Sequence, residues 1–151
     1  MSCHGIIIAA CATDNCGKTM ALRSIWFYLK KNNAKVISEQ EFNNQGGDKP
    51  GDVIAVLEYQ GIRIGISSMG DPGIDQEKIL DTFIKDHCRI ILCACRTKGF
   101  TKKAINLLRG TWDVRFFYPA AYRFISIDTL WNELMLAIRM IKFADANHHE
   151  G

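Results

Sequence analysis

Short apolar runs alternate along this chain with segments in which apolar residues recur every three or four positions. The runs occupy residues 5–11, 34–38, 52–59, 62–68, 89–95 and 114–118. The segments with the longer period cover about residues 17–31, a stretch that follows Asp75, residues 101–110 and residues 129–143. Short apolar runs between turn residues are typical of strands, and the longer period is typical of amphipathic helices. The pattern therefore predicts six strands and four helices.

Strands that alternate with helices indicate an α/β domain. Residues 52–59 and 62–68 are separated only by Gln60 and Gly61, a pair that favours a two-residue hairpin turn and so reverses one strand. We therefore predict the α/β class: a three-layer α-β-α sandwich with a mostly parallel sheet and one antiparallel hairpin strand. Residues 1–144 would form a single domain, and residues 145–151 a flexible tail.

A candidate phosphate-binding loop lies between the first apolar run and the first helical segment. It fits the pattern G-x-x-x-x-G-K-[ST], with alanine at the first position, over the residues Ala12, Thr13, Asp14, Asn15, Cys16, Gly17, Lys18 and Thr19. A loop between a strand and a helix start aims backbone N–H groups and the positive end of the helix dipole at an anion. The alternative is an accidental Gly-Lys-Thr sequence at a helix start.

With this motif in this context, residues 5–29 resemble the P-loop NTPase superfamily. Within that superfamily the chain is similar to small bacterial ATP-binding proteins of uncharacterised function. The narrower similarity rests on the hairpin of residues 55–67 and on two turns, Ser68-Met69-Gly70-Asp71-Pro72 and Arg96-Thr97-Lys98-Gly99. The resemblance implies the P-loop NTPase fold with ATP and Mg²⁺ as ligands. Lys18 would then reach the β- and γ-phosphates, and the Thr19 hydroxyl would hold Mg²⁺.

Carboxylates near the strand ends are candidates to complete the magnesium site, because ligands of open α/β sheets bind beyond the carboxyl ends of the strands. The first candidate is Asp71, which follows the strand of residues 62–68; it is equally well explained as an ordinary turn aspartate before Pro72. Asp14 is a candidate to orient an attacking water or hydroxyl, or is a solvated loop residue. We rank Glu58 lower, because an antiparallel strand would carry it to the opposite edge.

Arg96 is our candidate for a contact to phosphate or to the charge that develops during phosphoryl transfer; the alternative is a surface turn. The same turn also indicates which nucleotide base the protein binds. GTPases carry N/T-K-x-D here, whereas Phe100 stands where the guanine-reading aspartate would be, so we expect ATP. Tyr118, Tyr122 and Arg123 could stack on the base, although core packing explains the aromatic residues equally well.

Charge, hydropathy and cysteine spacing limit the class of protein and the compartment that the sequence favours. A net charge of +3 is not typical of a dedicated nucleic-acid binder, and no apolar run approaches the length of a membrane span. The sequence shows no signal-peptide pattern. The spacing of the 6 cysteines does not suggest a disulfide framework, which favours the reducing cytoplasm. Cys93 and Cys95 are conceivable as a metal pair, but a buried strand explains them better.

We therefore expect a Mg²⁺-dependent ATP-binding protein that hydrolyses ATP slowly. One alternative is a small-molecule or nucleotide kinase that transfers the γ-phosphate of ATP. A second alternative is a non-catalytic nucleotide-binding interaction module. The expected partners are a nucleotide and an unidentified small-molecule acceptor or protein, with no membrane and no strong nucleic-acid signal.

Overall fold

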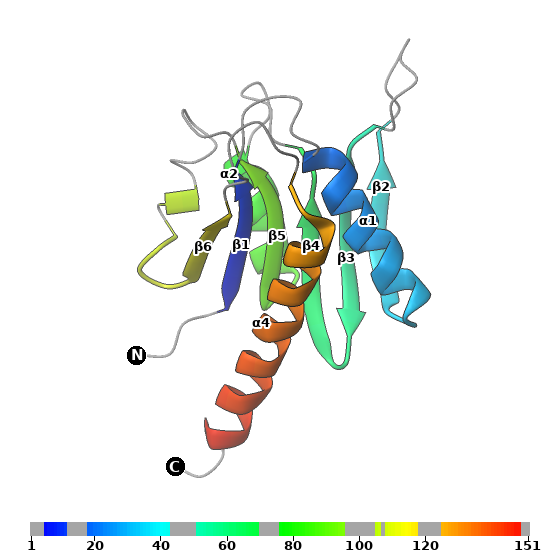
Figure 1. Cartoon of the computed structure of the whole chain (residues 1–151). Coiled ribbons are helices and arrows are strands. Elements are labelled where there is room, and N and C mark those ends of the chain that lie inside the picture. The colour runs from blue at the N-terminus through cyan, green and yellow to red at the C-terminus, as the bar shows by residue number, and fades with distance from the viewer. Residues whose placement is uncertain are drawn as a thin grey trace.

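The computed structural model describes residues 5–11, 18–42, 51–69, 76–95, 105–106, 108–117 and 125–148. These residues build one sheet with helices against both of its faces (Figure 1). The strands are β1 (Ile6–Cys11), β2 (Lys35–Glu41), β3 (Val53–Tyr59), β4 (Ile62–Ser67), β5 (Ile90–Cys95) and β6 (Asp113–Phe117). The helices are α1 (Lys18–Lys31), α2 (Gln76–Lys85) and α4 (Ile127–His148). The strand order in the sheet is β2-β3-β4-β5-β1-β6.

The two faces of the sheet carry separate apolar cores. Alternate residues of β1 point to opposite faces, so Ile6 and Ile8 pack in one core while Ile7 and Ala9 pack in the other. The first core contains the buried stripes of α1 and α4, and the second contains Leu80 and Phe83 of α2 together with Trp112. Figure 1 shows α1 and α4 on one side of the sheet and α2 on the other. The central strands are therefore buried on both faces.

The helix predicted over about residues 17–31 and the hairpin turn predicted at Gln60 and Gly61 are confirmed. Asn33 has a φ of 69°, and the chain leaves α1 through a bond from the Ala34 N–H to the Leu29 carbonyl at 3.0 Å. A residue with positive φ is a common helix end, and asparagine tolerates that conformation. In the hairpin, Gln60 and Gly61 have φ values of 53° and 79°, as a primed two-residue turn requires.

The fold class predicted from the sequence is wrong. The sheet is mixed rather than mostly parallel. Among the described strands, β2, β3 and β4 pair antiparallel, whereas the β4–β5, β5–β1 and β1–β6 pairings are parallel. The described structure therefore does not support the parallel three-layer sandwich of the P-loop NTPase fold. The sequence identified the hairpin but not the neighbour on its outer side. That neighbour is β2, and antiparallel strands can be joined by a short connection with no intervening helix.

The carboxyl-terminal helix is longer than predicted. We expected it to end near residue 143 and to be followed by a flexible tail, but α4 continues to His148. Asp145 accepts hydrogen bonds of 2.9 and 3.0 Å from the guanidinium of Arg89, so this part of the expected tail is a paired helical segment. Most of the helix predicted over residues 101–110 lies outside the described residues. No helix in the described part of the chain is long and apolar enough to span a membrane.

Gly65 of β4 lies directly beneath the ring of Phe83 from α2. A Cβ atom at this position would lie 2.6 Å from Cγ of Phe83. We expect Gly65→Ala to lower the free energy of unfolding by about 1–3 kcal/mol, because the buried ring must shift within a packed core. Urea denaturation measures the change. Gly110→Ala is the control, since nothing lies within 4 Å of its added Cβ, and equal stability losses in the two variants would contradict this packing.

Candidate functional site

The carboxyl ends of β1, β4 and β5 meet at one edge of the sheet, because these strands are parallel. The last residues of β1 and β5, Cys11 and Cys95, are register partners. Lys18 is the first residue of α1, and its Nζ donates to the carbonyl oxygen of Cys95 at 3.4 Å. The ammonium group of Lys18 therefore lies where the two central strands end.

Thr19, Asp52 and Ser68 form an oxygen-rich cluster at the same edge. The Thr19 hydroxyl donates to Oδ1 of Asp52 at 3.2 Å, and the Ser68 hydroxyl donates to the same oxygen at 2.8 Å. The backbone N–H of Val53 donates to Oγ of Ser68 at 2.9 Å. The cluster joins the first turn of α1, the residue before β3 and the residue after β4. One carboxylate with two hydroxyl groups is a ligand set of the kind that Mg²⁺ prefers.

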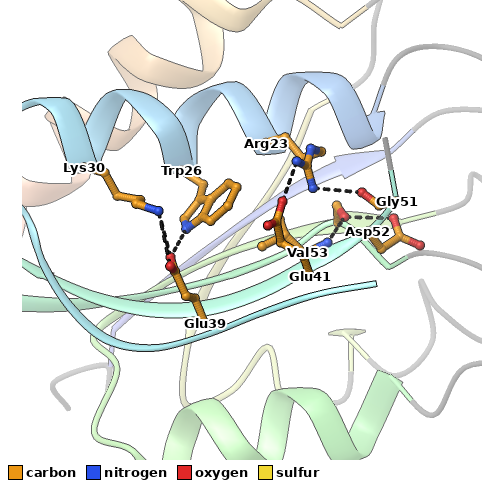
Figure 2. Close-up of polar contacts among 9 residues, drawn as sticks. Arg23, Trp26, Lys30, Glu39, Glu41, Gly51, Asp52 and Val53 are labelled. Atoms are coloured by element: carbon orange, nitrogen blue, oxygen red, sulfur yellow. Dashed lines mark hydrogen bonds and ion pairs between the residues drawn. The ribbon is translucent and has the colours of Figure 1, made fainter. Parts of the chain in front are cut away.

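Arg23 fixes the backbone beside Asp52 (Figure 2). Its Nη1 donates to the carbonyl oxygen of Gly51 at 3.0 Å, and its Nη2 donates to Oε1 of Glu41 at 2.7 Å. The N–H of Phe42 also donates to the carbonyl oxygen of Asp52 at 2.8 Å. Arg23 lies one helical turn after Thr19, so the same face of α1 contacts Asp52 and holds the peptide that precedes it.

The next two turns of this helix face attach β2 to α1. Nε1 of Trp26 donates to Oε2 of Glu39 at 2.9 Å, and Nζ of Lys30 donates to the same carboxylate oxygen at 3.1 Å (Figure 2). The ammonium of Lys30 also lies 4.3 Å from the centre of the Trp26 ring, within range of a cation–π interaction. Because β2 is mostly exposed, these polar contacts supply much of its attachment to the helical layer.

The structure describes only part of the site predicted from the sequence. Lys18 and Thr19 are described, and both lie at the expected edge. Glu58 lies at the opposite edge, as expected, since it pairs with Arg63 next to the hairpin turn. The other candidates lie outside the described residues: Ala12, Thr13, Asp14, Asn15, Cys16, Gly17, Asp71, Arg96, Tyr118, Tyr122 and Arg123. Their assigned roles stay predictions.

The sequence analysis missed Asp52, Ser68 and Arg23. For Asp52 a signal was present. A strand that runs against its neighbours brings its amino end to the edge where theirs have their carboxyl ends, so a carboxylate just before the predicted hairpin strand was a candidate ligand. Arg23 gave no such signal, because its position among the exposed and apolar residues of a helix does not indicate which loop it contacts.

The cysteines of the described segments belong to the core. Cys11, Cys88, Cys93 and Cys95 are all buried, and none forms a disulfide. Burial, with the Asp86 carboxylate as a second cause, raises the pKa of Cys88 to about 12. Burial also raises the pKa of Cys93, and the neighbouring Cys95 adds to this effect. Since the thiolate is the form that binds metals and reacts, Cys93 and Cys95 are best explained as small apolar residues of the strand.

Comparison of the chain with protein-family models, with curated proteins and with solved structures gives no match. The function must therefore be inferred from the residues of the site.

We expect Cys88 to resist alkylation in the folded protein. At pH 8.5 a thiol with the ordinary pKa of about 9 is roughly one-quarter ionised, whereas a pKa of about 12 leaves well under ~0.1% as thiolate. Iodoacetamide should label the Cys88 peptide in urea but not in buffer, as read by mass spectrometry. The unfolded chain releases this proton more readily, so stability should also fall as the pH rises above about 9. Rapid labelling of the native protein would show that the thiol is accessible and ionised.

Proposed function

We propose that the cluster at the carboxyl edge binds the triphosphate of ATP together with Mg²⁺. The observation that carries this proposal is the hydrogen bond of 3.2 Å from the Thr19 hydroxyl to Asp52, beside the ammonium group of Lys18 at the end of the central strands. This arrangement supplies an oxygen ligand set for a hard cation and a positive charge for an anion. Both are required wherever a protein holds a metal–triphosphate complex.

The chemistry of the donor set fits Mg²⁺. When the Thr19 hydroxyl donates its proton to Asp52, its lone pairs stay available to a cation. Ser68 donates to the same carboxylate oxygen, so the negative charge of Asp52 is held in place by two hydroxyl groups. Mg²⁺ is commonly bound through one or two protein carboxylates, with waters and phosphate oxygens in the other positions. When bound, the ion would neutralise the negative charge of the phosphate oxygens.

The first turn of α1 would hold the phosphate groups. The positive end of the helix dipole and the unpaired N–H groups of a first turn favour an anion. Lys18 would contribute a full positive charge there. The preceding residues 12–17, which fit the phosphate-loop pattern, would supply further N–H groups. We retain ATP over GTP because the sequence lacks the guanine-reading aspartate. The 4 buried thiols of the described segments support a cytoplasmic location.

Slow ATP hydrolysis is the reaction we propose. A kinase would need an acceptor site, and the described residues give no observation that favours one. A module that binds nucleotide without hydrolysing it would share the binding residues and differ only in turnover. An assay of phosphate release with Mg²⁺ and ATP separates hydrolysis from binding alone.

We expect Lys18→Ala to remove most of the stabilisation that Mg²⁺-ATP gives. ATP at about 100 times its dissociation constant should stabilise the wild-type protein by roughly 2.7 kcal/mol. Thermal unfolding with and without Mg²⁺-ATP measures the difference. Lys85→Ala is the control, because its side chain is exposed and pairs only with Asp81 among the described residues. ATP stabilisation that survives in Lys18→Ala would contradict the proposed site.

Asp52→Asn tests whether the carboxylate of Asp52 binds Mg²⁺. The asparagine oxygen can still accept from Thr19 and Ser68, but the negative charge that would attract Mg²⁺ is gone. We expect ATP to stabilise this variant to the same extent with Mg²⁺ and with EDTA, whereas Mg²⁺ should increase the stabilisation of wild type. Asp81→Asn, at an exposed site on α2, is the matched control. If Asp52→Asn keeps the full Mg²⁺ dependence, another carboxylate holds the ion, and Asp71 is the first to examine.

A further inference from the structure

Arg23 contacts both the backbone beside Asp52 and the end of the edge strand β2. Its guanidinium donates through Nη1 to the carbonyl oxygen of Gly51, the residue directly before Asp52, at 3.0 Å. Through Nη2 it donates to Oε1 of Glu41, the last residue of β2, at 2.7 Å. One planar group therefore binds two separate segments of the chain at the same time (Figure 2).

The guanidinium of Arg23 has a fixed place on α1. Its central carbon lies 5.4 Å from the centre of the Trp26 ring, within range of a cation–π interaction, and only 21% of the side chain is exposed. The N–H groups of a guanidinium form a rigid fork, so the two hydrogen bonds leave it in set directions. A shift of either Gly51 or Glu41 must therefore weaken one bond or move the guanidinium against the ring.

The position of the Asp52 carboxylate depends on this contact, because the peptide that Arg23 holds comes immediately before it. The hydroxyl groups of Thr19 and Ser68 orient Oδ1 of Asp52, at 3.2 and 2.8 Å. The N–H of Phe42, the residue after β2, donates to the carbonyl oxygen of Asp52 at 2.8 Å. Groups that orient a metal-binding side chain matter nearly as much as the ligand, since losing one costs roughly 10–100-fold in metal affinity.

The edge strand β2 is held to the helical layer by polar side chains at two points. Six of its 7 residues are exposed, so it buries little apolar surface of its own. At its end, Arg23 binds Glu41. Nearer its centre, Trp26 and Lys30 bind Glu39. A strand with few buried contacts opens more readily than the core, and one of its two attachments is the residue that also holds the peptide before Asp52.

We propose that Arg23 couples Mg²⁺ binding at Asp52 to the attachment of β2, an inference that rests on the proposed function. Arg23 acts through the peptide beside Asp52, so it is a positioning residue rather than a ligand. Coupling of this kind is reciprocal. If the bonds of Arg23 raise the affinity of Asp52 for Mg²⁺, then bound Mg²⁺ strengthens the same bonds to Gly51 and Glu41. The edge strand β2 is therefore held more firmly when Mg²⁺-ATP is bound than when the site is empty.

Charge and position predict opposite effects when Arg23 is replaced. Arg23→Met removes a cation and leaves Glu41 unpaired, which by charge alone would raise the affinity for Mg²⁺. It also releases the Gly51 carbonyl, which lowers that affinity. We expect the second effect to be larger, because the Glu41 side chain is 52% exposed and salt screens its charge. At a fixed ATP concentration, the Mg²⁺ concentration that gives half-maximal thermal stabilisation should rise roughly tenfold or more in Arg23→Met.

Hydrogen exchange measures how firmly β2 is held. Mg²⁺-ATP should slow the exchange of the amides of residues 35–41 in wild type by roughly fivefold or more, and should have no such effect in Arg23→Met. Lys30→Met is the matched control, because it removes an ion pair to β2 from the same face of α1. It should speed the exchange of β2 and leave the Mg²⁺ midpoint of thermal stabilisation as in wild type.

Arg23→Lys separates geometry from charge, because a compact ammonium keeps the positive charge but lacks the planar fork. It should raise the Mg²⁺ midpoint in the same direction as Arg23→Met. A midpoint that both variants leave unchanged or lower would overturn the role of Arg23. So would exchange of β2 in wild type that does not respond to Mg²⁺-ATP, and either result leaves the binding site intact. A wild-type protein that Mg²⁺-ATP does not stabilise would instead overturn the proposed function.

Discussion

The hydrogen bond between Thr19 and Asp52 joins the two halves of the mixed sheet at the point where the site forms. Thr19 belongs to the helix that follows the central strand β1, and Asp52 precedes β3, the strand that runs against its neighbours. A neutral hydrogen bond contributes about 1 kcal/mol, and one to a charged group about 1.5–3 kcal/mol. This single contact therefore matters less for total stability than for its location. It fixes a carboxylate at the edge where the other described strands have their carboxyl ends.

The antiparallel direction of β3 is the reason that Asp52 lies at this edge. In a sheet of parallel strands, the residues at the ligand edge all follow strands, whereas β3 contributes the residue that precedes it. The polar face of α1 then holds this arrangement along its length. Arg23 binds the carbonyl of Gly51, and Trp26 and Lys30 bind Glu39 of β2. Much of the attachment of the exposed edge strand to the helical layer is thus polar, and it shares one helix face with the candidate site.

Local patterns predicted the elements well and their arrangement less well. The strand before the phosphate-loop motif, the helix after it and the hairpin turn at Gln60 and Gly61 all follow from local patterns, namely apolar runs, apolar residues at helical spacing and a glycine that accepts a positive φ. The class of the sheet did not follow, because the outer neighbour of β3 is decided by burial and chain connection rather than by any local signal. Asp52 was missed although the direction of the predicted hairpin strand already determined the edge on which it lies.

Gln76 shows why a polar residue at a helix start is ambiguous in sequence. A glutamine there is ordinarily solvated, and only the structure reveals that its amide nitrogen donates to the carbonyl oxygen of Ala94 while its oxygen is buried. Lys18 approaches the next carbonyl from the opposite helix layer. A cation on one side and an acceptor on the other are complementary demands, since the first favours an anion and the second favours a hydrogen-bond donor.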